Sequence, residues 1–196
     1  MDSQIAPTTN SDALQSLIYE VIDGVPVYYH NYEAVLSGEQ TLEGIMGYGD
    51  LQWFLVNIIA DYFKEVFKDE FWVLAGDGDL HLSNNNNLAA DIGFIPRNEP
   101  FKVENFSNKY LNKAPKYVIE IDTKADPSIQ KEIDYYHRKT QRLLDFGVEQ
   151  VVWIYTDSKK VTVALPNQAW LTVNWSDEIG LHGHTFSIQS IIESVQ

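Results

Sequence analysis

The sequence predicts an α/β or α+β protein with a central mixed β-sheet, flanked by helices and preceded by a β-hairpin. Three observations support this class. Two helical patterns with broad apolar faces interrupt a series of strand-like runs. In the second half, a strand, a helix and a strand follow in that order, which indicates a right-handed parallel crossover. The remaining runs are joined by short turns, which favours antiparallel pairing.

Length and composition favour one domain. The 196 residues are 44% hydrophobic, enough to bury a core without a metal or disulfide. Residues 1–16 are polar and lack periodicity, so we expect a flexible lead-in before a single domain over residues 17–196. Cysteine is absent. This excludes disulfides, Cys-zinc sites and thiol nucleophiles and favours a cytoplasmic location. Because neither a signal peptide nor a run of roughly 18 apolar residues occurs, we expect no membrane partner.

The first half of the chain begins with a tight turn. Asp23-Gly24 is a dipeptide favoured in hairpins, and strand-like runs flank it. Further along, apolar residues recur at spacings of three and four, which predicts a helix with one broad buried face. Two more strand-like runs follow around a patch of asparagines, which we interpret as a turn. The expected elements are a hairpin over 17–22 and 25–29, a helix over 49–67, and strands over 71–82 and 88–95.

The second half opens with an irregular connection over residues 96–115, long enough for a binding loop. A strongly apolar strand follows, then an amphipathic helix that Gly147 terminates, then a buried strand. Short runs with antiparallel character and a short helix close the chain. The expected strands cover 116–123, 150–155, 159–165, 169–175 and 185–188, and the expected helices cover 126–146 and 188–194.

Three carboxylates interrupt these apolar strands. Glu120 and Asp122 are two residues apart, so a regular strand would point both the same way. Asp91 interrupts the run at 88–95. An ionised carboxylate in an apolar sheet costs several kcal/mol unless it is compensated, and a hard divalent cation compensates several together. The pattern predicts a metal site. The alternatives are carboxylates that face water at strand ends or that pair with Lys116 or Lys124.

The net charge of −14 is unevenly distributed. Residues 1–98 carry 3 basic and 15 acidic side chains, whereas residues 99–196 carry 11 and 13. A polyanion would therefore meet the second half. Nucleic-acid-binding proteins usually carry a basic footprint, and the chain as a whole lacks one. This charge balance counts against a nuclease.

Four segments nevertheless resemble a known family. They are YEVIDG at 19–24, ADIGFI at 90–95, APKYVIEI at 114–121 and KTQRLLDFGVEQVVWI at 139–154. In this order they resemble the Uma-type restriction endonuclease family of bacteria, which is part of the PD-(D/E)xK nuclease superfamily. The resemblance covers roughly residues 17–165. It implies a restriction-endonuclease-like fold.

The resemblance also implies roles for individual residues. Asp91 and Glu120 would hold Mg²⁺ or Mn²⁺. Asp122 occupies the position at which the superfamily has a lysine, so it is either a third ligand or a mark of lost activity. Lys139, on the following helix, would replace that lysine, with Lys124 as the alternative. Because Lys139 lies at the flank of the apolar stripe, it either reaches the site or is a solvated surface charge.

Glu20 matches an early glutamate of the family. It is either a further metal ligand or an ordinary exposed hairpin residue. The histidines are scattered, and His182-Gly183-His184 is interpreted as a turn. No phosphate-cradling glycine loop and no nucleophile elbow occur in the sequence. The larger aromatic residues of the second half are interpreted as core or edge residues: Tyr135, Tyr136, Trp153, Trp170 and Trp175.

The expected function is that of a magnesium-dependent endonuclease that hydrolyses phosphodiester bonds of nucleic acid, DNA foremost. As a homodimer it would present its less acidic faces to a duplex. One alternative is a nuclease-fold domain without strong catalysis that acts through protein contacts, which the acidic surface and the missing lysine favour. Another is a metal-dependent hydrolase of a small phosphorylated substrate.

Overall fold

The computed structural model describes residues 10–47, 49–84, 86–98, 111, 113–122 and 132–196. Its helices are α1 (Asn10–Ser16), α2 (Tyr32–Leu36), α3 (Leu42–Met46), α4 (Asp50–Val66), α5 (Glu132–Phe146) and α6 (Ile188–Glu193). Its strands are β1 (Ile18–Ile22), β2 (Val25–Tyr28), β3 (Phe71–Ser83), β4 (Asn86–Pro96), β5 (Tyr117–Ile121), β6 (Gln150–Tyr155), β7 (Lys160–Ala164), β8 (Leu171–Asn174), β9 (Ile179–Leu181) and β10 (His184–Phe186).

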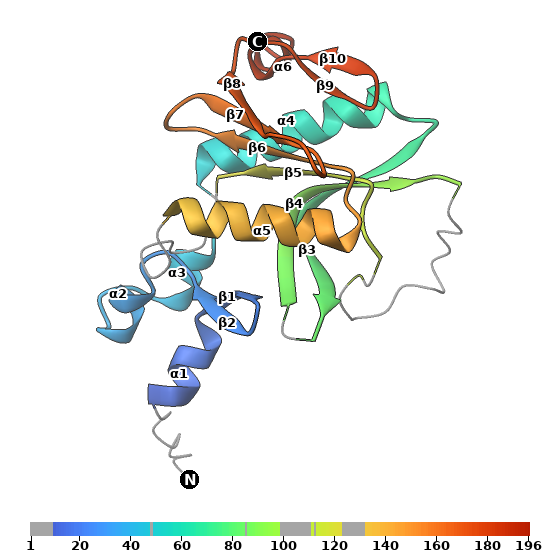
Figure 1. Cartoon of the computed structure of the whole chain (residues 1–196). Helices are drawn as coiled ribbons and strands as arrows, with labels where there is room; N and C mark the ends of the chain where they lie inside the picture. Colours follow the sequence, from blue (N-terminus) through green and yellow to red (C-terminus); the bar gives the residue numbers. More distant parts are fainter. Residues whose placement is uncertain (1–9, 48, 85, 99–110, 112, 123–131) are drawn as a thin grey trace.

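Eight strands form one mixed sheet in the order β2-β1-β4-β5-β6-β7-β8, with β3 paired to β4 (Figure 1). The neighbours β5 and β6, joined through α5, run parallel, and the other pairs are antiparallel. Strands β9 and β10 form a separate hairpin. The predicted fold class, a mixed sheet flanked by helices with an N-terminal hairpin, is confirmed. No helix in the described ranges is long and apolar enough to cross a membrane.

The sheet separates two hydrophobic cores. Strand β6 shows this most simply, because its side chains alternate between the two faces. Val152 and Ile154 pack in the core under α4 and α6, whereas Val151 and Trp153 pack in the core under α5. Strand β6 is therefore buried on both faces, which explains why its sequence is a continuous apolar run.

The N-terminal hairpin forms around Asp23 and Gly24 as predicted. Their φ angles are 55° and 76°, as a two-residue type I′ turn requires. The backbone N–H of Asp23 donates to Asn86 Oδ1 at 2.7 Å, which attaches the turn to the start of β4. Strand β1 also pairs with β4 through Val21 and Asn87. These contacts place the β1 side chains against the central sheet.

Strand β4 changes which core its side chains face at Asp91. Leu88 and Ala90 pack in the α5 core, but Ile92 and Phe94 pack in the α4 core, although all four are at even positions. A regular strand keeps even positions on one face, so β4 must turn over between Ala90 and Ile92. Asp91 therefore occupies an irregular point in the sheet.

Strand β3 accommodates this change with one extra residue. Its register with β4 shifts between Ala75 and Gly78, where three steps along β3 match two along β4. Gly76 lies within this bulge with φ 115°, a backbone conformation that side-chain-bearing residues rarely adopt.

Several elements differ from expectation. Residues 10–16, expected within a flexible lead-in, form α1. The helices α2 and α3 and the strand β9 gave no strong periodic signal in the sequence, because each is at most five residues long. Leu51 and Phe54 belong to the apolar pattern that predicted the helix over 49–67 and were expected on its buried face, but they are 50% and 43% exposed; the buried residues of α4 begin at Leu55. The expected start of the second long helix at 126, most of the connection at 96–115, and Lys124 lie outside the described residues.

Candidate functional site

Three charged side chains from distant segments meet beneath α5. Lys139 Nζ lies 2.8 Å from Glu20 Oε1 and 3.2 Å from Glu120 Oε1. Strand β1 provides Glu20, β5 provides Glu120, and α5 provides Lys139. All three residues are at most 2% exposed. This buried cluster decides two open alternatives: Lys139 is not a solvated surface charge, and Glu20 is not an exposed hairpin residue.

Glu20 is the most fully hydrogen-bonded member of the cluster. Besides the ion pair with Lys139, its Oε1 accepts from the backbone N–H of Ala89 at 3.0 Å. Its Oε2 accepts from the hydroxyl of Tyr135, one turn before Lys139 on α5, at 2.9 Å. Glu20 thus links the hairpin to β4 and to α5, and it orients Lys139. The sequence predicted only a core or edge position for Tyr135, although its position four residues before Lys139 places both on one helix face.

The carboxylate of Asp91 contacts the backbone at the residue that follows Glu120. Its Oδ2 accepts from the N–H of Ile121 at 2.7 Å, and the side chain is buried. The ladder between β4 and β5 extends only from Phe94 to Ile92 on β4. Beyond that point, where β4 turns over, the Asp91 carboxylate replaces a backbone carbonyl as the acceptor. The structure therefore places Asp91 and Glu120 close together, and their role as metal ligands stays a prediction.

Asp122 does not continue the strand, contrary to expectation. Strand β5 ends at Ile121, and Asp122 has a φ of 52°, so the rule of alternating faces does not apply to it. Its carboxylate accepts from Thr156: Oδ1 from the backbone N–H at 2.8 Å and Oδ2 from the hydroxyl at 2.6 Å. These bonds fix the end of β5 to the residue after β6. No sequence signal pointed to Thr156.

The electrostatics of the cluster are governed by its excess of acids. Burial raises the pKa of Glu120 well above its ordinary value, the nearby Asp91 and Glu20 raise it further, and only Lys139 opposes the rise. Burial by itself would lower the pKa of Lys139, but the carboxylates of Glu120 and Glu20 outweigh it and hold the pKa well above its ordinary value. Lys139 therefore keeps its proton at neutral pH, and Glu120 holds a proton more readily than an ordinary glutamate does.

The cluster offers two adjacent carboxylates for a cation. Glu120 Oε1 is buried and, among the described residues, makes no hydrogen bond besides its ion-pair contact with Lys139. Within the same residues, no three His, Cys, Asp or Glu side chains are arranged to hold a metal ion. Lys116, considered as a partner of the strand acids, instead pairs with Glu149 at 3.6 Å. A cation here would rest on Asp91 and Glu120, completed by water.

The fold is that of an α+β protein with a mixed sheet flanked by helices, and the ion cluster lies within it. A solved structure with the same arrangement is that of a "putative nuclease belonging to DUF820" from Anabaena variabilis. It matches with a TM-score of 0.66 at 16% sequence identity, over 90% of each chain. At this identity the likeness establishes the shared fold. No model of a known protein family matches the sequence, and no curated protein matches it significantly.

Proposed function

We propose that this chain is a nuclease that uses Mg²⁺ or Mn²⁺ to hydrolyse phosphodiester bonds of nucleic acid, DNA foremost. The observation that carries the proposal is the buried cluster in which Glu20 and Glu120 contact the ammonium of Lys139, with Asp91 close enough to raise the pKa of Glu120. Three carboxylates and one ammonium leave an excess of negative charge away from water. A hard divalent cation is the partner that best balances such a set.

The oxygen donors fit such a cation. Asp91 and Glu120 would hold it, because they are adjacent and Glu120 Oε1 has no hydrogen bond of its own within the described structure. A bound Mg²⁺ would supply charge neutralisation at the phosphoryl oxygens and a water of lowered pKa. Glu20 is less suited to be a ligand, since its oxygens already accept from Lys139, Ala89 and Tyr135.

Lys139 would act through its charge. A lysine with a raised pKa keeps its proton, so it cannot take one from water. It would instead stabilise the negative charge that develops on the phosphoryl group. Glu20 and Tyr135 would hold the ammonium in place. Because Asp91, Glu120 and Lys139 are all buried here, a phosphate reaches them only after a change in the elements that cover them.

The same burial favours a second candidate function. An ammonium enclosed by two carboxylates also serves as a structural ion cluster, and the net charge of −14 disfavours tight binding to a duplex. The second candidate is a nuclease-fold domain without strong catalysis that acts through protein contacts. We also propose that the chain forms a homodimer, which would present its less acidic faces to nucleic acid. Light scattering would measure the molecular mass and so the oligomeric state.

Calorimetric titration with Mn²⁺ or Mg²⁺ separates the two candidates. The nuclease proposal expects heat from the wild type and from a Glu149→Ala control, whose carboxylate is exposed, but none from Glu120→Ala. Cleavage of single-stranded DNA, duplex DNA and RNA would then be assayed with the metal and with EDTA. If the wild type shows no heat and cleaves no substrate, the nuclease proposal fails and the protein-contact role replaces it.

A further inference from the structure

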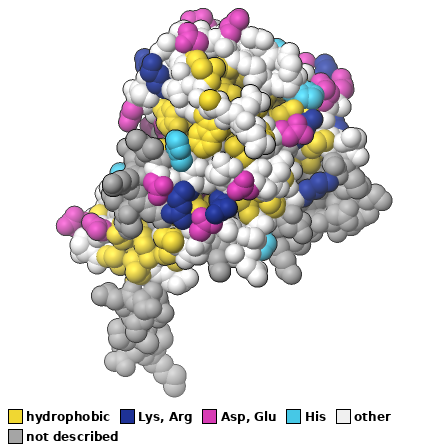
Figure 2. All heavy atoms as spheres, viewed as in Figure 1, with side chains coloured by type: hydrophobic (Ala, Val, Ile, Leu, Met, Phe, Trp, Pro, Cys, Tyr) yellow, Lys and Arg dark blue, Asp and Glu magenta, His cyan; other side chains and the backbone are white. Residues whose placement is uncertain are grey.

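A large pocket lies on the α5 side of the sheet, beyond the ion cluster. Its volume is about 710 Å³, which is within the range of roughly 300–1,000 Å³ typical of small-molecule sites. Figure 2 shows hydrophobic side chains gathered on the face between α5 and the C-terminal strands. The pocket is lined by Tyr136, His137, Thr140, Trp153, Tyr155, Ser158, Lys160, Thr162, Gln168, Trp170 and Thr172.

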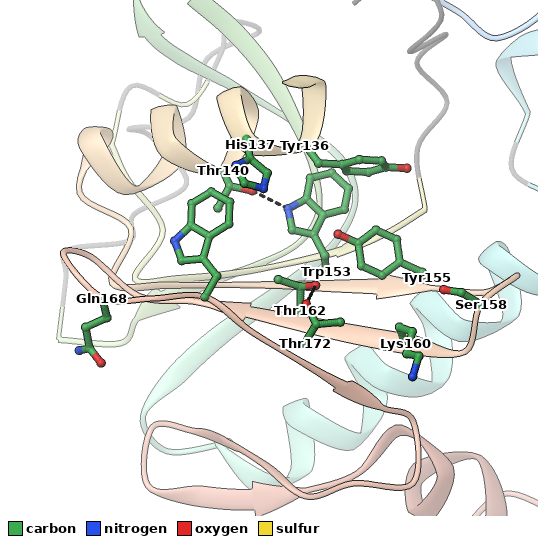
Figure 3. A pocket seen from close by; sticks show the side chains of 11 residues that line it. Tyr136, His137, Thr140, Trp153, Tyr155, Ser158, Lys160, Thr162, Gln168 and Thr172 are labelled. Atoms are coloured by element: carbon green, nitrogen blue, oxygen red, sulfur yellow. Dashed lines mark hydrogen bonds between the residues drawn. The ribbon is translucent and has the colours of Figure 1, made fainter. Parts of the chain in front are cut away.

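The register of the sheet builds the floor of this pocket. Trp153 on β6 lies opposite Thr162 on β7, which lies opposite Thr172 on β8. Residues directly opposite in an antiparallel ladder share a face, so these side chains form one row across three strands. The two threonine hydroxyls are 2.8 Å apart. In Figure 3, side chains of α5 lie above this row.

Aromatic rings form the walls. Tyr136 packs edge-on against Trp153 with ring centroids 4.7 Å apart, and Tyr155 lies parallel to Trp153 at 6.3 Å. Trp170 contacts the ring of His137 at 4.7 Å. Trp153 is almost fully buried, whereas Tyr136, Tyr155 and Trp170 are partly exposed. Partly exposed ring faces are surfaces on which another flat ring can stack.

The charge of the pocket is opposite to that of the molecule. Among the described residues, the lining includes Lys160 and His137 and no carboxylate, in a chain with a net charge of −14. Hydroxyls of Ser158, Thr162 and Thr172 add hydrogen-bond donors. This lining matches a ligand that combines an aromatic base with phosphate. The ring faces can stack on the base, and the hydroxyls and the cation can contact the phosphate.

The pocket also adjoins the proposed catalytic cluster. The indole N–H of Trp153 donates to Thr140, the residue after Lys139, at 2.7 Å. Lys139 Nζ lies 5.4 Å from the centroid of the Trp153 ring. The Trp153 side chain therefore lies between the pocket and the ammonium of the proposed catalytic cluster.

We propose that this pocket binds an unpaired base of a single-stranded nucleic acid. The ring face of a paired base is covered by its neighbours in the duplex, so only an unpaired base can stack on Trp170 or Tyr155. A single strand also has a lower charge density than a duplex, which lessens its repulsion by this acidic protein. The inference rests on the proposed nuclease function for its choice of nucleic acid, and it makes single strands the substrate class.

The test measures binding without catalysis. A labelled single strand of about 12 nucleotides, within the usual site sizes for single-strand binders, is titrated with the full chain in EDTA and followed by fluorescence anisotropy. The single strand should bind at least on the order of tenfold more tightly than the duplex of the same sequence. Trp170→Ala should weaken binding on the order of 10- to 100-fold, the effect of losing one stacked base. Trp53→Ala, on α4 and 63% exposed, should leave it unchanged.

A second pair of variants keeps the test valid if Trp170→Ala fails to fold. Thr172 and Leu171 are exposed neighbours on β8 whose side chains point to opposite faces. Thr172→Glu puts a carboxylate in the pocket and should weaken single-strand binding on the order of tenfold, whereas Leu171→Glu should not. Equal binding of duplex and single strand, or unchanged binding in both pocket variants, overturns the proposal. A free mononucleotide that binds as tightly as the strand overturns it too, because the pocket would then be a nucleotide site.

These outcomes are separable from those of the nuclease test. If Trp170 and Thr172 control strand binding but no cleavage occurs with any metal, the base pocket stands and the nuclease proposal fails. If Glu120 controls cleavage while the pocket variants bind and cleave like the wild type, the nuclease proposal stands and the pocket proposal fails.

Discussion

Lys139 Nζ on α5 lies 3.2 Å from Glu120 Oε1 on β5, and both side chains are almost completely buried. A single ammonium at this position balances part of the charge of Glu20 and Glu120. The free energy of unfolding and metal binding should therefore depend on the same residues. The carboxylates that would bind a metal are also buried charges that need a compensating charge in the folded protein.

Replacing Lys139 by Met should destabilise the protein by about 3–5 kcal/mol, because Glu20 and Glu120 would remain buried without a cation. Urea unfolding of the variant and the wild type measures the difference. Arg142→Met is the matched control: Arg142 also pairs with an acid, Asp23 at 2.8 Å, but its side chain is 42% exposed. The control should change stability by about 0–1 kcal/mol. Similar losses in both variants would contradict the prediction.

Stability should depend on pH through Glu120. Its pKa in the folded state is raised above the ordinary 4.5, so between 4.5 and the raised value the unfolded chain loses a proton that the folded chain keeps. The contribution of Glu120 to stability is therefore fully present below 4.5 and is lost as pH rises through the folded pKa. Glu120→Gln should gain stability relative to the wild type across this window, by up to about 1.4 kcal/mol per pH unit.

Asp23 provides a control of opposite sign for that measurement. Its hydrogen bond and charge interaction with Arg142 hold its pKa below the ordinary 3.8. Its contribution is present above 3.8 and is lost as pH falls through the folded pKa. Asp23→Asn should therefore be destabilising at neutral pH and approach the wild type in acid. Parallel pH profiles for the two variants would mean that the assignment of their pKa directions is wrong.

Asp91 and Asp122 should differ in metal binding. Asp91→Asn should abolish or strongly weaken Mn²⁺ binding, because one of two adjacent carboxylates would be lost. Asp122→Asn should retain most of the heat of binding, since both oxygens of Asp122 accept from Thr156. Thr156→Val, which removes one of these partners, provides a comparison for stability. Equal loss of binding in both Asp variants would restore Asp122 as a third ligand.

The contact between Trp153 and Thr140 should matter for stability. Thr140→Val leaves the buried indole N–H without its 2.7 Å acceptor and should cost about 1–3 kcal/mol. Thr162→Val changes a hydroxyl in the exposed threonine pair and should stay within about 0.5 kcal/mol of the wild type. Thermal unfolding, with near-ultraviolet circular dichroism to report on the indole, measures both. A large loss in Thr162→Val alone would contradict the proposed hydrogen bond.

The parts of the fold that the sequence predicts well are those with strong local signals. Strand β6 has the predicted bounds, Gln150–Tyr155, because a glycine stop and a continuous apolar run define it. The opening hairpin follows from Asp23-Gly24, since few other dipeptides tolerate two left-handed residues. The short helices α2 and α3 contain too few turns for a periodic pattern to appear.

The candidate site was predictable only in part, because its contacts connect distant segments. The strand pattern identifies Asp91 and Glu120 as conspicuous acids, but the burial of Lys139 depends on Glu20. Glu20 and Tyr135, which share a hydrogen bond, are 115 positions apart. Asp122 was placed incorrectly because a single positive φ angle ends the alternation of faces. The aromatic pocket was not expected, since its rings belong to separate strands and a helix.

The extra residue in β3 works as a spacer that lets one strand of the sheet serve both cores. Before the bulge at Gly76, Phe71 and Val73 are buried while Trp72 and Leu74 are exposed. The bulge fixes which residues of β4 this part of β3 pairs with. Deleting Gly76 would shift one part of β3 by one residue relative to β4 and would exchange its buried and exposed side chains. Small insertions and deletions at this point are therefore far less tolerable than at the exposed turns.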